Sequence, residues 1–107
     1  MSIPVIDVEQ LSALVASGAR VIDVRETAEY ESGHVPGAVH VALSTVPDHI
    51  DVFRGEGSAY VICQAGGRSQ RACEFLAQHG LDVVNVAGGT GAWISSGRAV
   101  VTGSTPT

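Results

Sequence analysis

The sequence is built around the segment AYVICQAGGRS, which covers residues 59–69. Its first four residues are hydrophobic, and such a short run predicts a buried strand that ends at Cys63. Gly66 and Gly67 predict a loop, and Arg68 and Ser69 begin a stretch with helical character. A loop between a strand and a helix directs several backbone N–H groups toward one point. We therefore interpret the segment as an active-site loop, with the thiol of Cys63 at its rim as the nucleophile.

Strands and helices alternate on both sides of this segment. Apolar runs predict four more short strands, at residues 3–6, 20–24, 39–41 and 83–86. Helical spacing and helix-ending glycines predict helices after Asp7, over 27–32, over 44–52, after Arg68 and after Gly91.

This alternation is typical of an α/β fold, with a mostly parallel sheet that carries helices on both faces. Ligands bind such sheets beyond the carboxyl ends of the strands. Arg25 and Cys63 both follow a predicted strand directly, so we expect both at that edge.

Length and composition indicate one globular domain. The 107 residues are 45% hydrophobic and their mean hydropathy is +0.24, which suits a compact core. We expect a single domain over residues 1–107, with its core at about 3–100 and a frayed tail at 101–107.

Charge and composition exclude several classes of function. The net charge of −5 and the pI near 5.1 argue against a nucleic-acid or membrane partner. All six basic residues are arginines, so Schiff-base chemistry and a Walker A loop, which both need lysine, are excluded.

Targeting and metal-binding signals are also missing from the sequence. We see no apolar stretch of membrane-spanning length and no signal peptide, and we expect a cytoplasmic protein. Two cysteines ten positions apart suit neither a disulfide scaffold nor a zinc site, and we expect no metal or cofactor.

Four segments together resemble the single-domain form of the rhodanese (sulfurtransferase) family. They are Asp23-Val24-Arg25, Glu29-Tyr30 with Gly33-His34-Val35-Pro36-Gly37-Ala38, the loop 63–69, and Gly88-Gly89 with Ala92-Trp93. Each is a weak signal alone, but all four in order are specific.

The resemblance implies a rhodanese-like fold, with a five-stranded parallel sheet flanked by helices. It also implies that Cys63 is the catalytic residue and carries a persulfide between a sulfur donor and an acceptor. The donor would be thiosulfate or a persulfide, and the acceptor a thiol or cyanide. A protein is a further candidate for either partner.

We assign the substrate-binding role to the loop and to one arginine outside it. These residues are Gln64, Ala65, Gly66, Gly67, Arg68, Ser69 and Arg25, with Asp23 in a supporting role. It stays open whether Arg25 contacts substrate or only a structural carboxylate. Ser69 is expected to cap the following helix or to hydrogen-bond the thiolate, and we favour the cap.

Sulfur transfer needs the thiolate of Cys63, because a thiol is a poor nucleophile. The positive end of the following helix and the nearby Arg68 and Arg71 would lower the pKa of this thiol. The second cysteine, Cys73, is expected in the core.

Three alternative functions stay open. Cysteine phosphatases and arsenate reductases use a similar loop, but the phosphatase loop has five residues between cysteine and arginine, and here there are four. A sulfur carrier or interaction module with little small-molecule turnover is the second alternative, because Gln64 and Ala65 give the loop a neutral entrance. A regulatory domain is the third, which the presence of Cys63 disfavours.

Overall fold

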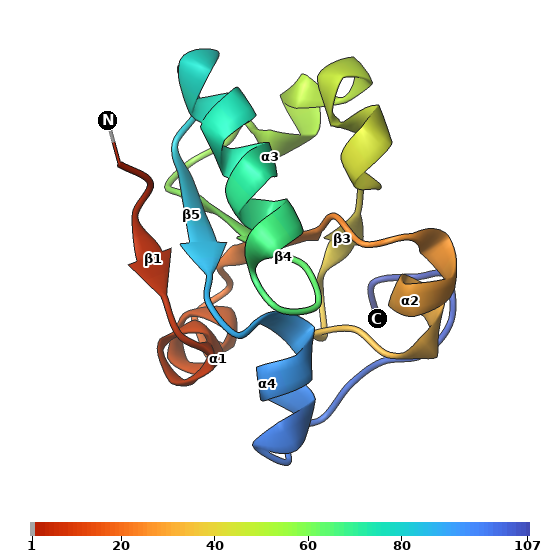
Figure 1. Ribbon diagram of the computed structural model, residues 1–107. Coiled ribbons are helices and arrows are strands. Elements are labelled where there is room, and N and C mark those ends of the chain that lie inside the picture. The colour runs from red at the N-terminus through yellow and green to blue at the C-terminus, as the bar shows by residue number, and fades with distance from the viewer. Residues whose placement is uncertain (1) are drawn as a thin grey trace.

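The sheet has five strands in the order β1-β5-β4-β2-β3, and all neighbouring strands run parallel. The structure is a computed structural model that describes residues 2–107 (Figure 1). The strands are β1 (Val5–Ile6), β2 (Arg20–Asp23), β3 (Val39–His40), β4 (Ala59–Ile62) and β5 (Val83–Val86). The predicted α/β fold with a five-stranded parallel sheet is therefore confirmed.

Helices cover both faces of this sheet. The α-helices are α1 (Val8–Ala16), α2 (Thr27–Ser32), α3 (Gly67–Gln78) and α4 (Gly89–Ser95), and the 3₁₀ helices are η1 (Leu43–Asp48) and η2 (Ile50–Phe53). Among residues 2–107, no helix combines the length and the apolar character needed to cross a bilayer.

The alternation of side chains along each strand creates two separate cores. In β4, Val61 belongs to a core with α3, η1 and η2, whereas the next residue, Ile62, belongs to a core with α1, α2 and α4. Successive side chains of a strand point to opposite faces, so a strand buried on both sides is apolar at most of its positions. The pattern explains why the short strands read as continuous apolar runs.

The segment predicted as one helix over 44–52 forms two 3₁₀ helices instead. Pro47 lies inside η1, where it supplies no backbone N–H for a longer α-helical ladder. His49 follows with φ −132° and ψ 33°, which separates η1 from η2. The single-helix prediction was therefore wrong, because apolar spacing does not report where the backbone turns.

Residues 101–107, which we expected to fray, instead make hydrogen bonds to α2 and to the turn that follows it. Val101 and His34 pair as an antiparallel bridge with N–H···O distances of 2.9 Å. The N–H of Gly103 donates to the carbonyl of Glu31, and the N–H of Gly37 donates to the carbonyl of Pro106. These contacts hold the C-terminus beside α2 (Figure 1).

Candidate active site

Cys63 lies immediately after β4, at the carboxyl edge of the sheet. The loop that follows it turns into α3 within four residues. Cys63 is 1% exposed, whereas Gln64, Ala65 and Gly67 are exposed. The sulfur therefore sits on the floor of the loop and not at its rim, where the sequence had placed it.

Hydrogen-bond donors of the loop point at this sulfur. The backbone N–H of Gly66 donates to Cys63 Sγ at 3.1 Å, and the Ser69 hydroxyl lies 3.3 Å from it. Burial raises the pKa of the thiol, but hydrogen bonds from the Ser69 hydroxyl and from the N–H groups of residues 69, 66 and 65 outweigh it. The pKa of Cys63 is therefore held below its ordinary value, which favours the thiolate.

Gly66 makes the sharp turn that brings these donors together. It is the N-cap of α3 and has φ +117°, a conformation that residues with a Cβ rarely adopt. Ser69 lies inside the first turn of α3, three residues after the N-cap Gly66, so it does not cap the helix. The cap that we favoured for Ser69 was therefore wrong, because the backbone enters the helix three residues earlier.

The start of α4 supports the loop from the other side. The N–H groups of Thr90 and Gly91 donate to the carbonyls of Cys63 and Gln64, at 2.9 and 3.0 Å. A Cβ at Gly89 would lie 2.5 Å from the carbonyl oxygen of Cys63. Close approach of α4 to the loop therefore requires glycine at this position.

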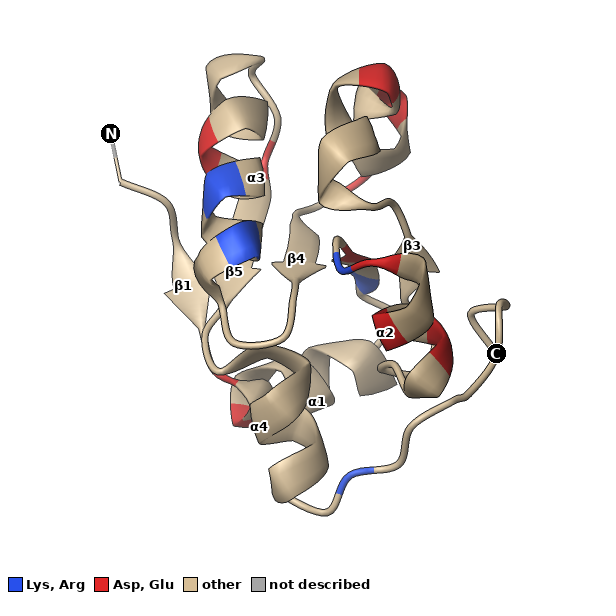
Figure 2. Ribbon diagram, turned by 45° about the vertical axis from the view of Figure 1, so that its right-hand side comes forward, with Lys and Arg blue, Asp and Glu red and all other residues tan. Residues whose placement is uncertain are grey.

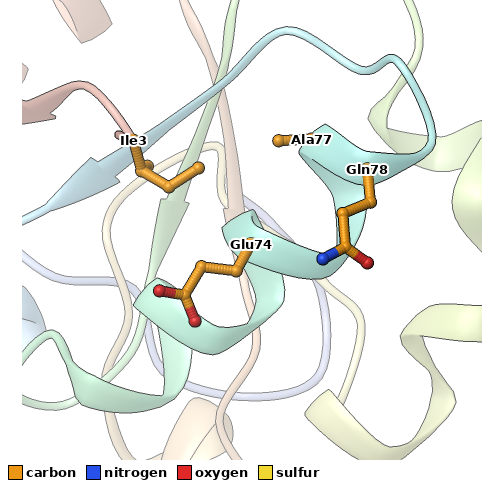
Figure 3. A pocket seen from close by; sticks show the side chains of 4 residues that line it. All are labelled: Ile3, Glu74, Ala77 and Gln78. Atoms are coloured by element: carbon orange, nitrogen blue, oxygen red, sulfur yellow. The ribbon is translucent and has the colours of Figure 1, made fainter. Parts of the chain in front are cut away.

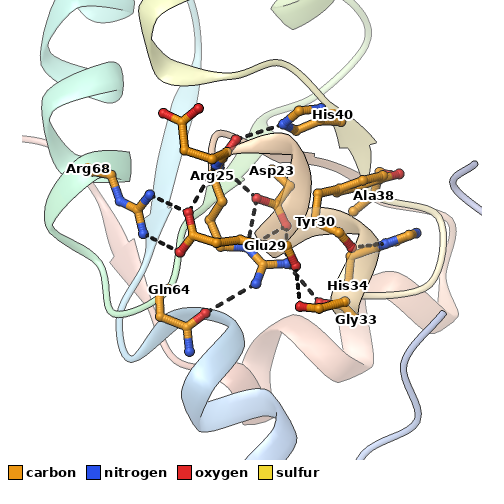
Figure 4. Close-up of polar contacts among 12 residues, drawn as sticks. Asp23, Arg25, Glu29, Tyr30, Gly33, His34, Ala38, His40, Gln64 and Arg68 are labelled. Atoms are coloured by element: carbon orange, nitrogen blue, oxygen red, sulfur yellow. Dashed lines mark hydrogen bonds and ion pairs between the residues drawn. The ribbon is translucent and has the colours of Figure 1, made fainter. Parts of the chain in front are cut away.

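Arg25 is held by a buried carboxylate (Figure 4). Its Nε and Nη2 donate to Asp23 at 3.1 and 2.9 Å, and the two side chains are 2% and 0% exposed. The other terminal nitrogen, Nη1, donates to Gln64 Oε1 at 3.1 Å. Arg25 thus reaches the active-site loop through Gln64, and Asp23 orients the guanidinium.

Arg68 forms a bidentate ion pair with Glu29 of α2 (Figure 4). Its Nη1 and Nη2 donate to the two carboxylate oxygens at 2.7 and 2.9 Å. The Arg68 guanidinium lowers the pKa of Glu29 to about 2, and Glu29 in turn raises the pKa of Arg68. Figure 2 shows the basic positions in the first turns of α3, where Arg68 and Arg71 lie.

Two residues that hold the loop were not assigned a role from the sequence. In the sequence, Glu29 belongs to one of the segments that resemble the rhodanese family, and Asn85 belongs to a predicted apolar strand. Glu29 is 39 positions from its partner Arg68, a separation that no local pattern reports. Asn85 did carry a signal, because it is a polar residue within an otherwise apolar strand, VVNV.

The second cysteine lies in a different environment. Cys73 is 0% exposed on α3 and packs in the same core as Ala72 and Leu76. Burial raises the pKa of its thiol to about 12. Cys73 is therefore a neutral core residue at neutral pH.

A pocket of about 360 Å³ lies elsewhere on the molecule (Figure 3). It is lined by Ile3, Glu74, Ala77 and Gln78, so it lies toward the C-terminal end of α3, whereas Cys63 faces the N-terminal end. Its lining brings no donors toward the Cys63 sulfur. The chemistry is therefore expected at the loop and not in this pocket.

Comparison with known proteins places this geometry in a family. The protein-family model that describes the rhodanese-like domain matches residues 7–96 of this chain. The chain is 36% identical over 89 residues to the thiosulfate sulfurtransferase GlpE of Pseudomonas entomophila. This match covers 82% of this chain and 82% of the relative. It is also 36% identical over 95 residues to the putative sulfur carrier protein YrkF of Bacillus subtilis. That match covers 86% of this chain and 51% of the relative, so this chain spans about half of that relative.

A solved structure supports the same grouping. The rhodanese-related protein of Thermoplasma volcanium superposes with a TM-score of 0.86 at 32% identity, covering 94% of this chain and 99% of that one. Residues 7–96, which the family model matches, contain strands β2 to β5, the loop after Cys63 and the start of α4. The chain therefore belongs to the rhodanese-like family, whose relatives named here include a sulfurtransferase and a putative sulfur carrier.

Proposed function

We propose that this protein is a sulfurtransferase that carries sulfane sulfur as a persulfide on Cys63. The observation that supports this most directly is the cradle around the sulfur. Cys63 Sγ faces the N–H of Gly66 and the hydroxyl of Ser69, at the N-terminal end of the 12-residue helix α3. N–H donors and a helix N-terminus stabilise an anion, and both thiolate and persulfide are anionic.

The reaction has two halves. The Cys63 thiolate attacks the outer sulfur of a donor, the donor's S–S bond breaks, and the rest of the donor leaves with the bonding electrons. With thiosulfate the leaving group is sulfite, and with a persulfide it is a thiolate. An acceptor thiolate or cyanide then attacks the outer sulfur on Cys63, and Cys63 leaves as a thiolate.

The charges around the loop favour a persulfide over thiosulfate as the donor. Two of the three arginines near the loop are paired with carboxylates, Arg25 with Asp23 and Arg68 with Glu29. The third, Arg71, is exposed on α3 and forms no ion pair within the described residues 2–107. Gln64 and Ala65 add no charge at the entrance. Of these three arginines, only Arg71 therefore offers thiosulfate, a dianion, a positive charge that no carboxylate compensates. A persulfide carries at most one negative charge on its sulfur atoms and needs less such charge.

Intact-mass spectrometry tests the persulfide. The native protein is exposed briefly to thiosulfate or to glutathione persulfide, beside the variants Cys63→Ser and Cys73→Ala. We expect one added sulfur atom on native protein and on Cys73→Ala, more completely from the persulfide donor, and none on Cys63→Ser. Addition to Cys63→Ser, or no addition to native protein from either donor, contradicts the proposal.

A sulfur carrier with little small-molecule turnover is the second candidate, and the paired arginines favour it too. For a carrier, we expect the Cys63 persulfide to remain when cyanide is added, and to lose its outer sulfur when a protein thiol is added. Rapid catalytic turnover of thiosulfate and cyanide would instead identify a small-molecule enzyme.

The phosphatase alternative is disfavoured by the position of Arg68. Both terminal nitrogens of Arg68 donate to Glu29, so its guanidinium is engaged outside the loop. Hydrolysis of an aryl phosphate that is lost in Cys63→Ser would reverse this ranking.

A further inference from the structure

Asn85 is a buried polar side chain in the middle of the sheet. It is the third residue of β5, which lies between β1 and β4, and it is 6% exposed. Its neighbours Val84 and Val86 are buried and apolar. A buried amide costs free energy unless its donors and acceptor are paired, so its partners indicate why it is there.

The amide has one orientation that its partners allow. Its Nδ2 donates to the carbonyl of Gly66 at 3.2 Å and to Gln70 Oε1 at 3.1 Å. Both partners are acceptors here, so the nitrogen must face them and Oδ1 must face Ser69. The Ser69 hydroxyl donates to Asn85 Oδ1 at 2.5 Å.

The Ser69 hydroxyl has a single proton and more than one acceptor within reach. Asn85 Oδ1 lies at 2.5 Å, the carbonyl of Gly66 at 3.2 Å and Cys63 Sγ at 3.3 Å. The Gly66 carbonyl already accepts from Asn85 and from the N–H of Gln70. The competition for the hydroxyl proton is therefore between Asn85 and the sulfur of Cys63.

We propose that Asn85 is a positioning residue that controls the reactivity of Cys63 by competing with its sulfur for the hydroxyl proton of Ser69. While Cys63 is a neutral thiol, the hydroxyl donates to Asn85. When Cys63 ionises, the hydroxyl shifts partly toward the thiolate, and this shift leaves Asn85 Oδ1 partly unpaired in a buried site, which costs free energy. Asn85 therefore restrains how far Ser69 stabilises the thiolate.

Such restraint suits a cysteine that acts in both halves of a transfer. Cys63 attacks as a thiolate and later leaves as a thiolate, and this consequence depends on the proposed sulfurtransferase function. A lower pKa increases the thiolate fraction and improves the leaving group, but it also weakens the nucleophile. Asn85 thus keeps the pKa of Cys63 low enough for the sulfur to ionise and to leave, but high enough for it to be a strong nucleophile.

Other groups also act on Cys63, and the test must hold them constant. The charged and titratable ones are Arg68 and Cys73, which both belong to α3. Strand β5 and the start of α4 bring the uncharged Asn85 and Thr90 to this region. Substitution of Asn85 by an uncharged residue leaves Arg68 and Cys73 unchanged.

The test is a double-mutant cycle of Asn85→Leu and Ser69→Ala, made in a protein that carries Cys73→Ala so that Cys63 is its one cysteine. The quantity measured is the rate of Cys63 alkylation by iodoacetamide as a function of pH, which gives the pKa of Cys63. Asn85→Leu keeps the shape of the side chain and removes its acceptor. We expect it to lower the apparent pKa of Cys63 by about half a unit to one unit, the equivalent of one net hydrogen bond. We expect Ser69→Ala to raise this pKa, and Asn85→Leu to have no further effect in the Ser69→Ala protein.

A merely structural role gives a different result. If Asn85 only supports the loop, Asn85→Leu loosens the N–H groups around the sulfur. The pKa of Cys63 would then rise or stay unchanged, and the change would be the same with and without the Ser69 hydroxyl. Either result overturns the proposal.

A second measurement needs no substitution at Asn85. The ¹³Cγ resonance of Asn85 is followed by NMR through the ionisation of Cys63. We expect this resonance to titrate with the Cys63 pKa in native protein and to lose most of that titration in Ser69→Ala. A resonance that does not titrate with Cys63, or that titrates equally in Ser69→Ala, overturns the proposal.

Neither measurement uses a sulfur donor, so the two proposals fail separately. An intact cycle in a protein that forms no persulfide would leave the role of Asn85 standing and reject sulfur transfer. Persulfide formation with no coupling between Asn85 and Ser69 would do the reverse.

Discussion

Cys63 and Cys73 lie ten positions apart in the sequence and are both buried, but the fold gives their sulfurs opposite chemistry. Hydrogen bonds from the loop hold the pKa of Cys63 below its ordinary value, although burial alone would raise it. Cys73 lies on an apolar helix face, and burial raises its pKa to about 12. Burial is thus common to both, and the supply of hydrogen-bond donors decides which cysteine is reactive.

The largest expected difference is in alkylation at neutral pH. With a pKa of about 12, Cys73 is ionised in roughly one molecule in 10⁵ at pH 7. The pKa of Cys63 is held below its ordinary value, and only a short, exposed loop separates its sulfur from solvent. Iodoacetamide should therefore modify one cysteine per native chain. Peptide mapping should locate that label on Cys63, and unfolded protein should take up two labels. Preferential labelling of Cys73 in native protein would contradict the comparison.

The two cysteines should also affect the pH dependence of stability with opposite signs. The folded pKa of Cys73 lies above its ordinary value of 9.0, so its contribution is complete below pH 9 and is lost as pH rises toward 12. Cys63 has a folded pKa below 9.0, so its contribution is present above that value and is lost as pH falls through the folded pKa.

Urea unfolding between pH 9 and 12 measures the Cys73 contribution. Native protein should lose up to about 1.4 kcal/mol of unfolding free energy per pH unit more than Cys73→Ala does. Parallel curves for the two proteins would show that burial of Cys73 does not control its ionisation. Tyrosine ionisation is common to both proteins and cancels in the comparison.

Gly89→Ala should damage the surroundings of Cys63 without touching Cys73. The new Cβ would lie 2.5 Å from the carbonyl oxygen of Cys63, at a residue with φ +59°. Backbone strain and overpacking together predict a loss of about 2–4 kcal/mol in unfolding free energy and slower alkylation of Cys63.

Gly97→Ala is the matched control for this substitution. Gly97 also has a positive φ, +81°, but its Cβ would meet no atom within 4 Å. Gly97→Ala should lower the unfolding free energy only by the cost of backbone strain, about 1–2 kcal/mol, and should leave the alkylation rate of Cys63 unchanged. Equal effects at both positions would mean that α4 does not shape the Cys63 loop.

Glu29→Gln should have the smallest effect. The variant removes the charge that pairs with Arg68, but both side chains are about one-third exposed, at 34% and 29%. After solvent screening, we expect a loss of about 0.5–1 kcal/mol at neutral pH. Glu31→Gln on the same helix removes the same charge from an exposed residue and is the control.

The effect of Glu29→Gln on the unfolding free energy should also depend on pH in the acid range. The pKa of Glu29 is lowered from 4.5 to about 2, so its contribution is present above pH 4.5 and is lost as pH falls toward 2. The difference in unfolding free energy between native protein and Glu29→Gln should therefore shrink over that interval. A difference that is constant from pH 7 to pH 2 would show that the ion pair does not stabilise the fold.

The sequence predicted the fold well because its signals are local. Short apolar runs separated by helix-forming stretches specify parallel strands buried on both faces, and the confirmed sheet has that arrangement. The single helix predicted over 44–52 was wrong because Pro47 and the backbone at His49 interrupt a continuous apolar pattern. The site residues assigned from the sequence stay predictions, and the experiments above test them.

By itself, the sequence determined how strands and helices alternate along the chain, the place of Cys63 after a buried strand, and the family. Each of these depends on short segments that can be recognised locally, wherever they lie in the chain. Only the tertiary structure decided that Arg68 pairs with Glu29, that Asn85 reaches Ser69, and that α4 closes on the Cys63 loop. Each of these contacts joins residues that are 16 or more positions apart. Their geometry depends on how the helices dock on the sheet, and hydrophobic periodicity does not specify that docking.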